Sequence, residues 1–324
     1  MNRKIFFATL SLTFALTSCN DDDDSKPEVT VVPDQLTVSN SNFFPEDIYV
    51  YDNQVYISGL GDGSLQKYDL TQTPASIKQV AAALDATYTS RWGIEVDAAN
   101  KTIVSIVNAP YFFNGKVTAP AKIVSNKLSD YSQVASWTLP EGTVGNSIEI
   151  VNGYYYIGDF GPNPRIIKLD PKTGKTTIKT DAQWTGLFGF GGIVAANNGL
   201  YAVQGGKMWY LPIDTKGDLG IPVAVSGLSN VFADGMTWAD NNILYYATND
   251  ANNPANVGTV WKVTFTDKTT ATIAKASIAD NGSLNNPSGV FYTTINQKNY
   301  LLVNESQLQT TPTLPFKVIV NEIK

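Results

Sequence analysis

The segment Glu46-Asp47-Ile48-Tyr49-Val50 is the first of six similar segments in this 324-residue chain. Each segment has a variable first residue, then usually a small or turn-forming residue, and then apolar residues spaced by two. This spacing is the periodicity of a β-strand. The other five segments are Trp92-Gly93-Ile94-Glu95-Val96, Asn146-Ser147-Ile148-Glu149-Ile150, Gly191-Gly192-Ile193-Val194-Ala195, Asp234-Gly235-Met236-Thr237-Trp238 and Ser288-Gly289-Val290-Phe291-Tyr292.

The spacing of the segments indicates the fold. They begin at residues 46, 92, 146, 191, 234 and 288, so successive starts are 46, 54, 45, 43 and 54 residues apart. A repeat of about 40–50 residues is typical of one propeller blade. A second apolar stretch follows each segment, as at 154–157, and a third strand with a polar turn usually comes next, as at 165–174. We therefore predict an all-β fold, a six-bladed β-propeller, over residues 29–324.

The two ends of this region are expected to meet. Apolar stretches at 29–32 and 36–38 precede the first blade and have no sheet of their own, whereas the last blade offers only three strands, at 289–294, 299–304 and 316–322. A strand from 29–40 would complete the sixth blade, close the ring and cover an unpaired edge. Helical periodicity is weak throughout, with residues 76–84 as the best short candidate.

Residues 1–18 have the features of a signal peptide, with Arg3 and Lys4 ahead of an apolar stretch that is short for a spanning helix. The sequence Leu16-Thr17-Ser18-Cys19 resembles the lipobox of bacterial lipoproteins. This resemblance implies cleavage before Cys19 and attachment of lipid to it, and several acyl chains anchor a protein stably. The alternative is an ordinary secretory peptide with a chance cysteine.

Residues 19–28 include Asp21-Asp22-Asp23-Asp24 and read as a solvated acidic tether. The acidic run is similar to the export signal of surface lipoproteins in Bacteroidetes-type bacteria. We therefore expect a protein anchored by lipid to the outer membrane and facing the cell surface, with the periplasmic face as the alternative. The lipid would be its only contact with the membrane.

Charge and composition exclude several classes of function. The chain has 23 basic and 29 acidic residues, and removal of Arg3 and Lys4 with the signal peptide leaves 21 against 29, or −8. With no basic cluster, nucleic acid is not expected as a partner. The chain has no histidine, which excludes a Ser-His-Asp triad, an HExxH zinc site and a histidine dyad.

The first residues of the six segments should surround the central channel, because the first two strands of each blade are antiparallel. Three of these residues, Glu46, Asn146 and Asp234, carry the oxygen ligands that a divalent cation such as Ca²⁺ prefers. The alternative is that they only cap turns. The residues that end the second strands should rim the same mouth, and they include Asn108, Asp159, Gln204, Asn249 and Asn304.

Aromatic residues near the mouth could stack against a sugar ring, although propeller cores also contain many aromatics. We expect core positions for most of them, with Phe188 and Phe190 packed between blades, and leave the exposure of Tyr111, Phe112 and Phe113 open. The residues predicted to bind substrate are Arg91, Trp92, Asn146, Asp159, Asn249 and Asn304.

Two motifs resemble the gluconolactonase/regucalcin family of six-bladed propellers. Phe232-Ala233-Asp234-Gly235-Met236 is similar to that family's PDGM segment, and Pro45-Glu46-Asp47-Ile48 is similar to the segment that bears its first acidic ligand. The resemblance implies that Glu46 and Asp234 hold a divalent cation and that Asp234 is the general base. This chain departs from the family at Gly191, where the family has a metal-binding asparagine, while Asn146 falls at its substrate asparagine.

Two functions from different classes therefore stay open. One is a hydrolase of lactones or similar esters that depends on a divalent metal, most simply Ca²⁺ held by Glu46 and Asp234 with the help of Asn146. The other is a non-catalytic surface propeller that binds a glycan or a protein. Either would place a small-molecule or carbohydrate ligand at the channel mouth. Gly191 favours the second function, and the Glu46–Asp234 pair favours the first.

Overall fold

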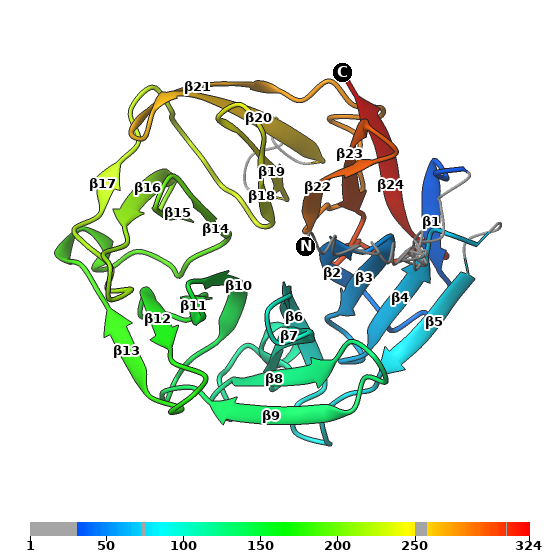
Figure 1. The fold of residues 1–324 in the computed structure, drawn as a ribbon, viewed down its shortest axis with the longest axis horizontal. Coiled ribbons are helices and arrows are strands. Elements are labelled where there is room, and N and C mark those ends of the chain that lie inside the picture. Colours follow the sequence, from blue (N-terminus) through cyan, green and yellow to red (C-terminus); the bar gives the residue numbers. More distant parts are fainter. Residues whose placement is uncertain (1–30, 73–75, 250–257, 309) are drawn as a thin grey trace, which may run out of the picture.

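The computed structural model describes residues 31–72, 76–249, 258–308 and 310–324. These residues form six four-stranded antiparallel sheets arranged radially around a common centre (Figure 1). The predicted six-bladed β-propeller is confirmed. The predictions for the signal peptide, Cys19 and the acidic tether lie outside the described residues. Among the described residues, no helix is long and apolar enough to cross a membrane.

The first three blades run from the innermost strand outward in chain order. Their strands are β2 (Pro45–Tyr51), β3 (Gln54–Gly59), β4 (Leu65–Asp69) and β5 (Ser76–Ala81), then β6 (Ser90–Asp97), β7 (Thr102–Asn108), β8 (Lys122–Lys127) and β9 (Gln133–Thr138), then β10 (Gly145–Val151), β11 (Tyr154–Asp159), β12 (Arg165–Leu169) and β13 (Thr176–Lys179). Residues 76–81 form a strand, so the best short helical candidate in the sequence, 76–84, is not a helix. The short helix α1 (Tyr111–Asn114) follows β7.

The last three blades repeat this order, with a short 3₁₀ helix, Ala182–Trp184, before the fourth blade. Their strands are β14 (Ile193–Ala196), β15 (Gly199–Gln204), β16 (Lys207–Pro212) and β17 (Val223–Ala224), then β18 (Met236–Ala239), β19 (Ile243–Thr248), β20 (Thr259–Asp267) and β21 (Thr270–Lys275), then β22 (Val290–Ile295), β23 (Lys298–Asn304) and β24 (Phe316–Ile323).

The ring closes through β1 (Gln35–Val38), which pairs with β24 as the outermost strand of the sixth blade. The predicted closure by an N-terminal strand is therefore confirmed. Leu36 lies opposite Val318 and is buried, and the Thr37 amide donates to the hydroxyl of Tyr68 in the first blade at 2.8 Å. The closing strand is thus held by both blades that it joins.

Two sequence features explain the regular geometry. The hairpins between first and second strands often turn on two residues with positive φ, such as Asn197-Asn198 and Asn241-Asn242, as tight antiparallel hairpins require. The apolar residues of the strands form separate clusters between neighbouring blades. One cluster packs Ile48 and Ile57 of the first blade against Phe316 of the sixth. The core therefore lies between the blades.

Candidate functional site

A β-bulge at the start of the innermost strand turns the first two segment residues toward the channel. In the first blade Pro45 pairs with Gly59 and the next pair is Ile48 with Ile57, so Glu46 and Asp47 together oppose one residue. The second and third blades show the same shift, at Trp92-Gly93 and Asn146-Ser147. Bulges commonly re-aim side chains next to functional sites. Here they bring Glu46, Asp47 and Asn146 to the channel.

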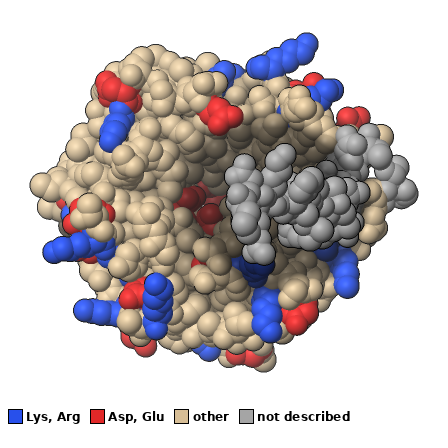
Figure 2. Space-filling model, in the orientation of Figure 1, with Lys and Arg blue, Asp and Glu red and all other residues tan. Residues whose placement is uncertain are grey.

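Two hollows share Glu46, Asn146 and Asp234 in their lining, so these residues mark the boundary between them. We name the hollow that Trp92, Phe160 and Phe188 line the mouth pocket. The hollow that Asp47, Glu95 and Glu149 line is the inner chamber. The space-filling view shows acidic side chains within the central hollow of the ring (Figure 2). The structure therefore brings the three predicted metal ligands together.

Hydrogen bonds fix the orientation of the boundary residues. The Asn146 amide Nδ2 donates to the carbonyl oxygen of Gly191 at 2.9 Å, and the Asn249 Nδ2 donates to Asp234 Oδ2 at 2.8 Å. The backbone around Glu46 is held from the sixth blade, because the Ser288 hydroxyl donates to the Glu46 carbonyl at 2.8 Å. Each boundary residue is thus positioned by a contact with another loop or blade.

Both boundary carboxyl groups have raised pKa values. Burial, followed by the charges of Asp234 and Asp47, raises the pKa of Glu46 well above its usual value. Burial also raises the pKa of Asp234 to about 6, although hydrogen bonds from Asn249 and Asn146 act to lower it. Two neighbouring acids without a basic partner are therefore ready to stabilise a positive charge placed between them.

The mouth pocket has a volume of about 350 Å³ and mostly apolar walls. Phe160 is central to these walls: its ring centroid lies 5.8 Å from that of Trp92 and 4.8 Å from that of Phe188. Its other apolar lining residues include Leu60, Phe112, Val203, Val231, Phe232 and Leu308. Aromatic walls above a polar floor are the usual design of a small-molecule site.

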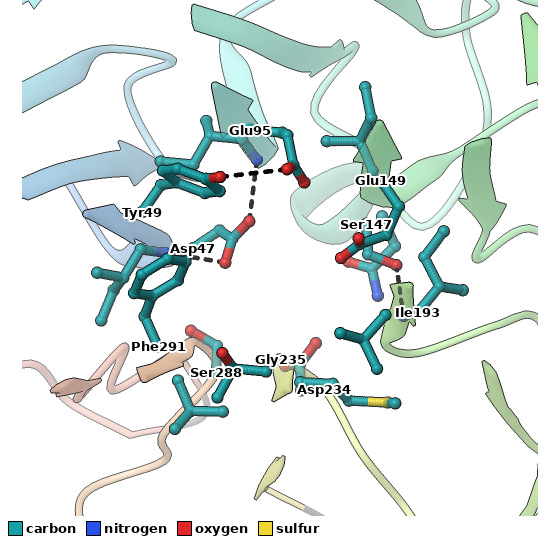
Figure 3. A pocket seen from close by; sticks show the side chains of 18 of the residues that line it. Asp47, Tyr49, Glu95, Ser147, Glu149, Ile193, Asp234, Gly235, Ser288 and Phe291 are labelled. Atoms are coloured by element: carbon teal, nitrogen blue, oxygen red, sulfur yellow. Dashed lines mark hydrogen bonds between the residues drawn. The ribbon is translucent and has the colours of Figure 1, made fainter. Parts of the chain in front are cut away.

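The inner chamber has a volume of about 220 Å³ and adds three more acids, Asp47, Glu95 and Glu149, whose carboxyl groups turn toward the central space (Figure 3). Burial raises the pKa of Asp47 to about 7 and that of Glu149 to about 8, and it raises that of Glu95 well above its usual value. Asp47 Oδ2 accepts from the Ile94 amide at 2.9 Å, which connects the first two blades. The channel is thus acidic beyond the boundary.

Six residues were predicted to bind substrate. Two of them, Trp92 and Asn249, line the mouth pocket away from its boundary with the inner chamber. Asn146 belongs to the boundary. Three others line neither hollow, and the protein itself engages them. The buried Arg91 guanidinium donates to the Gly63 and Ala82 carbonyls and to the Ser105 hydroxyl.

The other two residues outside the hollows are Asp159 and Asn304. Asp159 accepts from Arg165 Nε at 2.7 Å and from the amides of Val144 and Gly161. Asn304 is fully buried and binds the Ser288 segment and the Glu46 carbonyl. The expectation that Arg91, Asp159 and Asn304 reach a substrate is therefore corrected: they join strands and blades.

Gly191 also differs from its expected role. A Cβ atom at this position would clash with the carbonyl oxygen of Ala233, so a side chain here would meet the fifth blade rather than project freely into the channel. The Gly191 carbonyl, by contrast, accepts from Asn146 and Ser147. The backbone of Gly191 therefore supports the boundary. A metal-binding side chain would not fit at this position without displacing the Ala233 backbone.

Several lining residues were missed by the sequence analysis. Phe188 is 55% exposed and lines the mouth pocket, whereas Phe190 is buried between blades as expected. Trp184 is likewise buried in the core, and Phe112 lines the pocket. A signal for the inner acids was present, because Glu95 and Glu149 occupy the same position of an otherwise apolar strand segment.

The boundary residues offer a metal ion only part of a coordination shell. Glu46 and Asp234 supply two carboxylates and Asn146 an amide oxygen, which suits a hard cation if water completes the shell. Among the described residues, no group of three or more His, Cys, Asp or Glu side chains has an arrangement that could hold a metal ion. The donor set therefore fits an open divalent site and not a closed one.

The fold and this site define the chain as a six-bladed β-propeller with an acidic, aromatic-walled channel. No family model and no curated protein sequence matches it. One similar structure is the allergen Mala s 1 of Malassezia sympodialis, with 16% identity, a TM-score of 0.68 and coverage of 90% of this chain and 96% of that one.

Two further structures show the same fold. An auxiliary nutrient binding protein from Bacteroides thetaiotaomicron has 13% identity and a TM-score of 0.62, covering 87% of this chain and 70% of that one. A luciferin-regenerating enzyme has 11% identity and a TM-score of 0.59, covering 89% and 95%. These likenesses establish the fold, whose members have both binding and enzymatic roles.

Proposed function

We propose that this protein binds a small organic molecule in the mouth pocket. The observation that carries the proposal is the composition of that pocket: aromatic side chains such as Trp92, Phe160 and Phe188 form the walls, and polar groups of Glu46, Asn146 and Asp234 form the floor. Burial of apolar surface supplies affinity, and a few positioned polar groups select the ligand. The description of one similar structure as a nutrient binding protein supports a binding role.

A panel of small molecules tested by thermal shift and ligand-observed NMR examines this proposal. The panel should contain sugars, lactones, amines, carboxylates and neutral aromatic compounds. Phe188→Ala should abolish or weaken the binding of a hit at least tenfold. Ile221→Ala is the matched control, because Ile221 is also an exposed large apolar residue, at 74%, and lies outside the pocket. Equal loss in both variants, or hits unaffected by Phe188→Ala, contradicts binding at the mouth.

A second candidate function is the hydrolysis of a lactone or ester with a divalent metal. The specific observation that favours it is the pairing of Glu46 with Asp234, whose charges repel each other unless a cation lies between them. When bound, a metal ion polarises a carbonyl and activates water. Asp234, held by Asn249, would be positioned to accept a proton.

Calcium titration tests this second candidate directly. Millimolar Ca²⁺ should raise the melting temperature of the wild-type protein, because a ligand that prefers the folded state stabilises it. Asp234→Asn should reduce that shift and abolish lactone hydrolysis. A wild-type melting temperature that is unchanged by Ca²⁺, Mg²⁺ and Mn²⁺ contradicts a metal-dependent function and leaves pocket binding in place.

We also propose that the protein acts at the outer membrane, anchored through Cys19 and exposed at the cell surface. The lipobox-like sequence and the acidic tether support this location. A surface position would give the mouth pocket access to ligands from the medium.

A further inference from the structure

We propose that the mouth pocket is selective for an organic ammonium ion whose apolar body lies against the aromatic walls. This inference rests on the proposed function and names its ligand class. Three observations carry it: the charge of the floor, the state of the hydrogen-bonding groups, and the aromatic lining.

The floor of the pocket carries negative charge without a positive partner. Glu46 and Asp234 both line it, and no Lys or Arg lines either hollow among the described residues. Arg91 is the basic residue closest in sequence to the ring position Trp92, and its guanidinium is engaged by Gly63, Ser105 and Ala82. A positive ligand would therefore supply the countercharge, whereas a carboxylate or phosphate would be repelled.

Each side-chain nitrogen that could donate into the pocket already makes at least one hydrogen bond within the protein. Trp92 Nε1 donates to Ser90, Asn146 Nδ2 to Gly191 and Asn249 Nδ2 to Asp234. The fourth donor, Gln204 Nε2, binds the Phe188 carbonyl at 2.8 Å. The described lining contains no Ser, Thr or Tyr hydroxyl. A ligand rich in acceptors, such as a lactone without a metal ion, finds few side-chain donors here.

One hydrogen-bond acceptor among the residues that line the mouth pocket has no partner. Gln204 is almost fully buried, yet its Oε1 has no hydrogen-bond partner. An unsatisfied buried acceptor is costly, and a ligand donor that reached it would remove the cost. With the carboxylates of Glu46 and Asp234, the pocket thus offers acceptors to a ligand that donates. An ammonium group has only donors and a positive charge.

The walls suit the rest of such a ligand. The rings of Trp92, Phe112, Phe160, Phe188 and Phe232 line the pocket. A cation close to an aromatic face is attracted by the ring quadrupole, and the same faces bury an apolar body. A simple aryl-alkyl ammonium ion combines both properties.

Three probes with the same body test the inference: phenethylamine, 2-phenylethanol and 3-phenylpropionate. Binding is measured by calorimetry at pH 7.5, with and without EDTA. Phenethylamine should bind at least tenfold more tightly than the alcohol, the propionate should not bind, and EDTA should change nothing. Asp234→Asn and Glu46→Gln should each weaken amine binding at least tenfold. Both variants remove repulsion between buried acids, so their melting temperatures should not fall.

Two further variants complete the test. Gln204→Leu removes the unsatisfied acceptor and should weaken amine binding severalfold, whereas the control Glu322→Gln removes an exposed acid outside the pocket and should not. Equal or tighter binding of the alcohol or propionate overturns the ammonium assignment, and so does amine binding that EDTA abolishes. If the alcohol or the propionate binds and Phe188→Ala abolishes that binding, the proposed function of the mouth pocket survives although the ammonium assignment fails. Absence of binding by every panel compound contradicts both.

Discussion

The side-chain amide of Asn249 donates a 2.8 Å hydrogen bond to Asp234 Oδ2, and so joins the end of one strand to the start of the neighbouring innermost strand. This contact stabilises the charged form of Asp234, whose pKa burial nevertheless raises to about 6. The ionisation of Asp234 is therefore set by a balance between burial and the hydrogen bonds from Asn249 and Asn146.

Asn249→Ala should raise the pKa of Asp234 above about 6, because it removes a donor that favours the carboxylate. The charge of Asp234 in turn raises the pKa of its neighbour Glu46 from β2. The pH midpoint of phenethylamine binding should shift upward in this variant. An unchanged midpoint, as expected for Glu322→Gln, would show that Asn249 does not control Asp234.

The protein without ligand should become less stable as the pH rises from about 5 to 8. Asp47 and Glu149 have pKa values raised to about 7 and about 8, so the folded state holds protons that the unfolded state releases. Stability from such groups is complete below their unfolded pKa values and is lost as pH rises through the folded ones. Glu149→Gln should flatten the fall and add on the order of 1 kcal/mol at pH 8. Urea unfolding at several pH values provides the measurement.

Leu36→Ala should destabilise the ring by about 2–4 kcal/mol, since it leaves a cavity between the first and last blades. Leu36 is 2% exposed in β1 and packs in the cluster with Val38 and Phe316. Val31→Ala is the control, because Val31 is 62% exposed and a loss there should be small. Similar denaturation midpoints for the two variants would contradict closure by β1.

Gly191→Asn should destabilise the protein and should not tighten metal binding. The new Cβ would meet the Ala233 carbonyl oxygen, and overpacking of this kind costs roughly 1–3 kcal/mol or more. Thermal melts with and without Ca²⁺ measure both effects. A stable variant with a larger Ca²⁺ shift than wild type would show that the fourth blade can supply a ligand after all.

Cys19→Ala should release the protein from the membrane fraction or stall its processing, because the lipid is proposed as the only anchor. Cell fractionation followed by immunoblotting provides the measurement, and protease treatment of intact cells reports surface exposure. Unchanged association of the variant with membranes would refute the lipid anchor.

The sequence alone determined the number of blades and the closure of the ring. Both depend on local periodicity: apolar residues alternate along each strand, and the repeat length sets one blade. The sequence also identified Glu46, Asn146 and Asp234 as neighbours, because antiparallel pairing places equivalent residues at the same end of every blade. A sixth blade with only three strands was enough to predict the role of β1.

Only the tertiary structure decided which polar groups remain free for a ligand. Arg91, Asp159 and Asn304 carry polar side chains that could bind a substrate, and they lie at or next to the strand ends where the sequence placed them. Hydrogen bonds to other parts of the protein nevertheless engage all three. The bulges decided that Glu46 and Asp47 both reach the channel, which simple strand alternation does not predict. Phe160, Phe188 and Phe232 come from three separate loops, and they form one wall because the ring brings those loops together. Side-chain direction and the availability of hydrogen-bonding groups depend on contacts between residues distant in sequence, and no local pattern records them.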